Sequence, residues 1–197
     1  MRPWLTLLVV ALLAACAGAA RETAPQRAPD FRPMEVRQPA VIVRMTLAAG
    51  RFSDREREVL PATYEGALLD GLDARAVLPR DTQRVTSGAL DPSAAVARAR
   101  AIGADHAILV DVDVTRGEPI FCRQAPRPFR ASATTWAQTL TVLRATDGAT
   151  RLAVGGPALV VTDLEPDCDD PRRSRRRSGH ETAVEAVTRL LTPLLGS

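Results

Sequence analysis

The sequence contains no lysine and no asparagine, so all 26 of its basic residues are arginine. Since alanine is also abundant, we interpret this bias as a sign of GC-rich coding rather than of chemistry. The 23 acidic residues leave a formal net charge of only +3. A charge this small creates no strong overall field, which disfavours nucleic acid as a partner.

Residues that bind metals are equally scarce. The chain has three cysteines and two histidines, His106 and His180, and neither histidine has the spacing to a cysteine that a zinc site needs. The acidic run at residues 167–170 lacks the glycine turn and the alternating ligands of a calcium loop. We therefore predict no metal and no cofactor.

The longest apolar run lies at the N-terminus, at residues 4–15, and is shorter than the roughly 20 residues of a membrane-spanning helix. It follows Arg2 and ends on small residues, which is the layout of a secretory signal peptide. Its end, LAAC at residues 13–16, resembles the bacterial lipobox. That resemblance implies a signal peptide over residues 1–15 and lipidation of Cys16. The alternatives are ordinary cleavage near residues 17–19 and an uncleaved N-terminal anchor.

Residue 17 is alanine. In enterobacterial lipoproteins aspartate at this position retains the protein at the inner membrane, so the resemblance implies the periplasmic face of the outer membrane. Residues 16–39 carry prolines among charged and small residues, a composition that predicts a semi-extended tether behind the lipidated cysteine. Residues 40–197 are predicted to form one periplasmic domain.

The two remaining cysteines, Cys122 and Cys168, form an even pair in a chain predicted to be exported. Such a pair indicates a disulfide, which would stabilise the fold by about 3–4 kcal/mol. Two free buried thiols and a metal pair are the alternatives.

The first half of the predicted domain alternates strands and helices. Residues 40–48 read as a buried strand, and Ser53 with Glu56 forms a capping box ahead of a helical apolar stripe that ends at residue 72. Pro61 lies either in the first turn of this helix or inside a longer one. We expect a short strand at residues 76–78 and a loop at residues 80–90.

The second half begins with a helix capped by Asp91-Pro92 and ended by Gly103. Strands follow at residues 106–114, 134–145 and 150–162, and Ser178 with Glu181 caps a terminal helix. The predicted order is β-α-β-α-β-β-β-α. The fold class is α/β (α+β), with a single mixed sheet of four to five strands and about three helices packed on it.

The stretch AVARARAIGADHAILVDVDV, followed by a strand, a TDG turn and another strand, carries a resemblance to known proteins. It resembles the periplasmic α/β domain shared by the curli-secretion lipoprotein, the lipoprotein activator of penicillin-binding protein 1B, and the N-terminal domain of the Tol-Pal propeller protein. The resemblance implies a binding or assembly module rather than a catalyst. The auxiliary lipoproteins of lipid-transport ABC systems are the alternative family.

Candidate catalytic groups are few. Asp111 and Asp113 form a DxD on one strand face, as in metal-dependent glycosyltransferases, but no glycine-rich phosphate loop accompanies them. His106 lies on the face expected to be buried and reads as a structural histidine. A triad of Ser93, His180 and Asp169 lacks the nucleophile-elbow pattern. We predict no catalytic residue, with an envelope enzyme that uses Asp111 and Asp113 as the competing hypothesis.

The most prominent charged feature is an arginine run, which is a candidate patch for an anionic ligand or a partner, although a solvated loop without a ligand is the simpler interpretation. It consists of Arg172, Arg173, Arg175, Arg176 and Arg177. Anionic lipid head groups, acidic peptides and a partner protein are candidate ligands, and a disordered, solvated loop is the alternative.

The sequence as a whole therefore predicts an outer-membrane-anchored periplasmic lipoprotein. We expect it to act as a non-enzymatic assembly, accessory or regulatory module of the cell envelope. Its expected partners are the membrane, through the lipid on Cys16, and an envelope protein or anionic lipid.

Overall fold

The computed structural model of the protein describes residues 24–123, 128–156 and 158–195. Cys16 and the predicted signal peptide lie outside these ranges. Among the described helices, none is long and apolar enough to cross a membrane.

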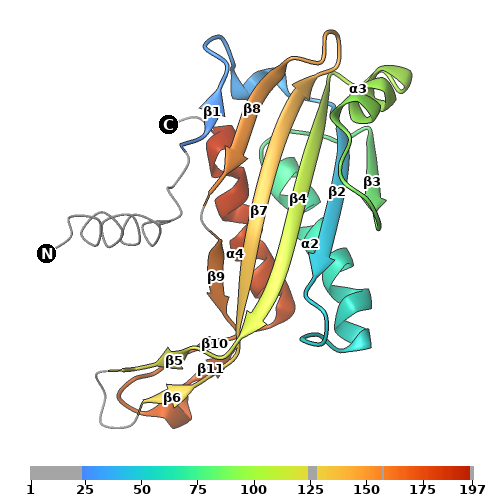
Figure 1. Ribbon diagram of the computed structural model, residues 1–197. Coiled ribbons are helices and arrows are strands. Elements are labelled where there is room, and N and C mark those ends of the chain that lie inside the picture. The colour runs from blue at the N-terminus through green and yellow to red at the C-terminus, as the bar shows by residue number, and fades with distance from the viewer. Residues whose placement is uncertain (1–23, 124–127, 157, 196–197) are drawn as a thin grey trace, which may run out of the picture.

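The fold is one mixed β-sheet with helices on both faces, which confirms the predicted α/β class (Figure 1). The strand order is β1-β8-β7-β4-β2-β3, and β9 also pairs with β7. Strand β2 is parallel to β3 and β4, whereas the other pairs are antiparallel. The strands of this sheet are β1 (Gln26–Arg27), β2 (Ala40–Leu47), β3 (Asp81–Val85), β4 (His106–Gly117), β7 (Ala133–Arg144), β8 (Thr150–Gly155) and β9 (Leu159–Thr162).

Two small antiparallel sheets project from one end of the main sheet and form what we term the extension (Figure 1). One pairs β5 (Ile120–Phe121) with β6 (Phe129–Arg130), and the other pairs β10 (Leu164–Glu165) with β11 (Arg175–Arg176). Short 3-10 helices lie at η1 (Pro33–Glu35), η2 (Pro171–Arg173) and η3 (Thr192–Leu195).

The described residues contain three α-helices, α2 (Asp54–Asp73), α3 (Pro92–Ala101) and α4 (Gly179–Leu191). Helices α2 and α4 pack against each other on one face of the sheet, and α3 covers part of the opposite face. Successive side chains of β4 point to opposite faces of the sheet, so this strand contributes to the cores on both faces. Ile108 faces the larger core under α2 and α4, whereas Leu109 faces the smaller core under α3. A helix of ten residues is only about 15 Å long, so α3 does not reach the far half of β4.

The helix starts follow the predicted caps. Ser53 and Glu56 form a capping box at the start of α2, and Ser178 and Glu181 form another at the start of α4. Pro61 lies inside α2, because the capping box starts this helix at residue 54 rather than at the proline.

The second strand is not where the sequence predicts it. Residues 76–78 are not a strand, since Ala76 has a positive φ of 56° and the chain turns there. The strand is β3, inside the segment expected to be a loop. Its sequence DTQRV is polar because it is an edge strand with little buried surface, so it carries no alternating apolar pattern.

The main sheet also has seven strands rather than four to five. One addition is β1. The other arises because the predicted strand at residues 150–162 is divided into β8 and β9 after Gly155, and both pieces pair with β7.

Part of the segment predicted as a tether packs on the domain, at residues 26–36, which we term the arm. Strand β1 pairs with β8, and Phe31 and Val36 are buried in the main core. Arg151 of β8 holds this arm through ion pairs to Asp30 and Glu35. Burial of these aromatic and aliphatic side chains stabilises the packed arm. The proline-rich composition of the segment gives no indication of this packing.

Candidate binding groove

A groove of about 810 Å³ lies where α2 and α4 begin, next to the extension. Its walls include Val59 and Leu60 from α2 and Thr182 from α4, and Trp136 of β7 lines it as well. The groove therefore combines elements that are far apart in the chain. Its size is typical of sites that bind small molecules or short peptide segments.

The first turns of both helices are rigidly capped at this groove. The backbone N–H of Ser53 donates to Glu56 Oε2 at 2.8 Å, and that of Ser178 donates to Glu181 Oε2 at 2.7 Å. Hydrogen bonds from the Ser53 backbone N–H, the Ser53 hydroxyl and Arg116 together lower the pKa of Glu56 to about 2. Glu56 is thus an ionised acceptor at neutral pH.

Arg116, at the end of β4, joins the cap of α2 to the extension. Its Nη1 lies 2.8 Å from Glu56 Oε1 and its Nε lies 3.7 Å from Asp163 Oδ2. Asp163 also accepts hydrogen bonds from Ser132 Oγ at 2.5 Å and Thr134 Oγ1 at 2.7 Å. The carboxylates of Glu56 and Asp163 are therefore occupied by groups of the protein itself.

Other arginines at the groove are less constrained. Arg177 pairs with Glu185 at 2.7 Å, whereas Arg55, Arg130 and Arg176 are exposed and have no carboxylate partner among the described residues. Among the described residues, the Arg130 side chain donates only to the backbone carbonyl of Glu118, at 3.1 Å. Three guanidinium groups from α2, β6 and β11 therefore remain able to bind an anion.

The buried residues beside the groove form a polar chain within the core. Trp136 is 1% exposed and stacks on Tyr64, with ring centroids 5.6 Å apart. The Tyr64 hydroxyl donates to Gln138 Oε1 at 2.6 Å, and Gln138 Nε2 donates to the Ala186 carbonyl at 3.1 Å. Burial raises the pKa of Tyr64 above its ordinary value.

The predicted arginine run is folded rather than a disordered loop, since Arg175 and Arg176 form β11. Arg175 pairs with Glu165 at 2.9 Å and with Glu181 at 2.7 Å, and Arg173 lies 3.6 Å from Asp170. Arg177 pairs with Glu185, while Arg172 and Arg176 are exposed and unpaired within the described ranges. Of the five arginines, Arg176 and Arg177 line the groove.

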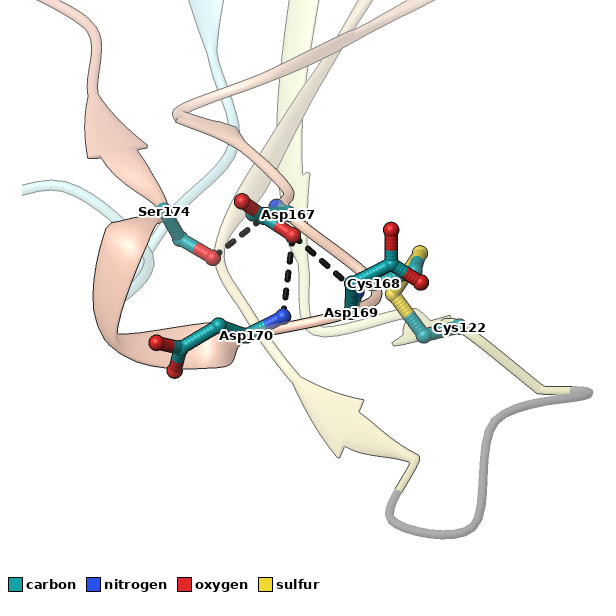
Figure 2. Close-up of a disulfide and its surroundings, with 6 residues drawn as sticks. All are labelled: Cys122, Asp167, Cys168, Asp169, Asp170 and Ser174. Atoms are coloured by element: carbon teal, nitrogen blue, oxygen red, sulfur yellow. Dashed lines mark hydrogen bonds between the residues drawn. A yellow bond between two sulfur atoms is a disulfide. The ribbon is translucent and has the colours of Figure 1, made fainter.

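Cys122 and Cys168 form the predicted disulfide, with their Cα atoms 5.3 Å apart (Figure 2). It joins the end of β5 to the loop between β10 and β11. Asp167 organises that loop by accepting the backbone N–H groups of Asp169 at 3.0 Å and Asp170 at 2.9 Å. The disulfide therefore ties together the two parts of the extension that carry Arg130 and Arg176.

The other sequence candidates lie away from the groove. Arg44 of β2 binds Asp111 of β4 through two hydrogen bonds of 2.7 and 2.5 Å. Asp113 is exposed, also on β4. In the described parts of the chain, no group of three or more His, Cys, Asp and Glu is arranged to hold a metal ion.

The histidines do not form a catalytic constellation with the residues considered. His106 is 4% exposed, 3.3 Å from Asp105 and 3.7 Å from Glu35. Ser93 begins α3, on the opposite face of the sheet from α4, which carries His180. Ser93 and His180 therefore do not meet in a triad with Asp169.

The sequence did not single out Arg55, Arg116, Arg130 or Asp163 as site residues. Each reads locally as an ordinary surface charge, and only the folding of β4, β6 and α2 toward one another brings these residues together. The one local signal was the capping boxes, which mark the helix starts at the groove.

Comparisons with known proteins give distant structural similarities. No protein-family model matches the chain, and no curated protein matches it. PelC from Paraburkholderia phytofirmans, solved as a dodecamer, is 13% identical and has a TM-score of 0.42, with 86% of this chain and 94% of that chain covered. Lipoprotein GNA1162 from Neisseria meningitidis is 10% identical and has a TM-score of 0.38, with 81% and 100% covered. At identities and TM-scores this low, neither similarity establishes a family or a function.

Proposed function

We propose that the protein is a lipid-anchored, non-enzymatic binding module of the bacterial cell envelope, and that the groove is its partner-binding surface. The observation that carries this proposal is the convergence of Arg55, Arg130 and Arg176 on one groove. These arginines come from separate elements and lack carboxylate partners in the described residues. Exposed guanidinium groups converging on a concave surface favour recognition of a partner.

Lipid anchoring is supported by the distribution of the cysteines. Of the three in the chain, Cys122 and Cys168 are joined to each other. Cys16, in the lipobox-like LAAC, is therefore not part of that bond and is available for acylation. A disulfide also suits the oxidising compartment outside the cytoplasm.

A non-enzymatic role is supported by the state of the groove carboxylates. A general acid or base works best with a pKa near the operating pH, whereas the pKa of Glu56 is lowered to about 2. Asp163 is held by two hydroxyl donors and lies beside Arg116. Both side chains serve to fix the groove in this proposal.

We further propose that the module works by position, at the periplasmic face of the outer membrane and within the envelope-assembly group that residues 95–114 resemble. The arm is paired with the sheet from Gln26, so only a short stretch links it to Cys16. At no more than about 3.5 Å per residue, that stretch holds the domain within roughly 35 Å of the bilayer. Partners must therefore lie close to the membrane surface.

The anchor is tested by labelling with an alkyne-bearing palmitate analogue in a bacterial host. Cys16→Ala is expected to abolish the label and to release the protein from the membrane fraction. The matched control is the double variant Cys122→Ser/Cys168→Ser, which should keep the label because it leaves Cys16 intact. Label retained in Cys16→Ala would refute lipid anchoring at this residue.

A further inference from the structure

Building on the proposed function, we infer that the groove binds an acidic segment of a partner polypeptide, whose carboxylates pair with Arg55, Arg130 and Arg176. The inference names the class of partner. It would fail separately from the anchor, because lipidation of Cys16 does not depend on the groove.

Charge is the first argument. Five arginines line the groove against three carboxylates, those of Glu56, Glu118 and Asp163. Arg116 engages two of these carboxylates, and Arg177 pairs with Glu185. The surplus positive charge is therefore concentrated on Arg55, Arg130 and Arg176, each of which can bind a carboxylate with its planar fork of donors.

Buried donors without acceptors are the second argument. Trp136, which lines the groove, is 1% exposed, and its Nε1 has no hydrogen-bond acceptor among the described residues. The Nε of Arg116 is also buried, and its nearest carboxylate oxygen, on Asp163, is at 3.7 Å, beyond hydrogen-bonding distance. Both atoms are shielded from solvent, so an acceptor carried by a ligand reaches them only if the groove shifts on binding, which a change in Trp136 emission would report.

The surface between the arginines favours a peptide over a phosphate head group. Val59 is 50% exposed, and Leu60 and Leu164 also line the groove, so apolar side chains of a segment would find contacts there. The exposed guanidinium groups of Arg55, Arg130 and Arg176 would pair with carboxylates spaced along such a segment. A segment in which acidic and apolar residues alternate matches both features.

Binding is measurable through the tryptophan at the groove. Trp4 and Trp136 are the two tryptophans of the chain, and Trp4 lies in the predicted signal peptide, so Trp4→Phe makes Trp136 the sole fluorophore whether or not that peptide is removed. The membrane-extracted protein with this change, in detergent, is titrated with a hexapeptide of alternating glutamate and leucine, blocked at both ends. We expect saturable emission changes and a Kd that rises at least about tenfold in Arg55→Ser/Arg130→Ser/Arg176→Ser.

The matched control replaces three exposed arginines outside the groove, in Arg32→Ser/Arg123→Ser/Arg172→Ser, and should bind like the parent. The replacement of the groove arginines by lysine should restore much of the affinity and guards against a folding defect in the serine variant. No saturable binding below about 1 mM overturns the inference, as does equal weakening in the control. Arginine-dependent pelleting with phosphatidylglycerol vesicles in the absence of peptide binding overturns it in favour of a lipid.

Discussion

At the scale of single residues, Arg151 connects the N-terminal arm to the sheet. Its side chain is 6% exposed, and it donates to Glu35 Oε1 at 2.7 Å and to Asp30 Oδ1 at 2.8 Å. The hydrogen bond from Arg151 is the largest cause of the lowered pKa of both carboxyl groups. Because Asp30 and Glu35 are 72% and 27% exposed, water can solvate both carboxylates when Arg151 is replaced, and the arm loses the two ion pairs that join it to β8.

We predict that Arg151→Met detaches the arm, because methionine fills similar space without the guanidinium. Cleavage by trypsin after Arg27, in β1, should become at least about tenfold faster as the arm opens more often. Mass spectrometry of timed digests measures this rate. Arg84→Met, which removes a partly exposed pair with Glu65 between β3 and α2, is the control and should leave the rate unchanged. Equal rates in wild type and Arg151→Met would contradict the role assigned to Arg151.

At the scale of elements, the contact between α2 and α4 depends on a glycine. A Cβ atom at Gly71 would lie 2.9 Å from Leu191 Cδ1 and 3.2 Å from Val187 Cγ1, and both of these side chains are buried. At Gly66, on the exposed side of the same helix, a Cβ would meet nothing within 4 Å. A substitution at Gly66 therefore tests helix propensity, whereas one at Gly71 also tests the packing of α2 against α4.

We predict opposite effects at these two positions. Gly66→Ala should raise the free energy of unfolding by about 0.5–1 kcal/mol, through helix propensity alone. Gly71→Val should lower it by about 1–3 kcal/mol, because the added methyl groups push α2 away from α4. Urea denaturation followed by circular dichroism measures both changes. A stabilising Gly71→Val would show that the helices can separate without cost.

Helices and strands could be predicted from the sequence where the pattern that specifies them lies within a few consecutive residues. The strand at residues 106–114 and the two capping boxes are present because alternation and side-chain caps act within a few residues of sequence. Strand β3 was missed because an edge strand has little apolar surface to bury. The packed arm was missed because proline and charge obscured Phe31 and Val36, whose burial depends on β8 and the main core.

At the scale of the whole molecule, the groove could not be predicted from the sequence. Arg55, Arg116, Arg130 and Arg176 belong to four elements, and no local pattern links them. The arginine run became the candidate site because its charges are close together in the sequence. In the structure, three of its five arginines pair with carboxylates of the protein itself. The feature that distinguishes Arg55, Arg130 and Arg176 is the lack of a carboxylate partner among the described residues, which only the fold reveals.

The disulfide affects both the stability of the whole molecule and the arrangement of the groove. Cys122 and Cys168 are 46 residues apart, so the bond closes a loop that contains β7, β8 and β9. Removing such a bond frees the unfolded chain, at a cost of about 3–4 kcal/mol for a loop of this length. The bond also holds together the parts of the extension that carry Arg130 and Arg176.

We therefore predict two effects of Cys122→Ser/Cys168→Ser. The free energy of unfolding in urea should fall by about 3–4 kcal/mol, and binding of the alternating peptide should weaken because two of the three unpaired arginines become less ordered. Treatment of the wild type with a reductant should reproduce both effects, whereas Cys16→Ala should produce neither. Unchanged peptide affinity together with the expected loss of stability would mean that the extension orders itself without the bond, and that Arg130 and Arg176 are positioned by β6 and β11 alone.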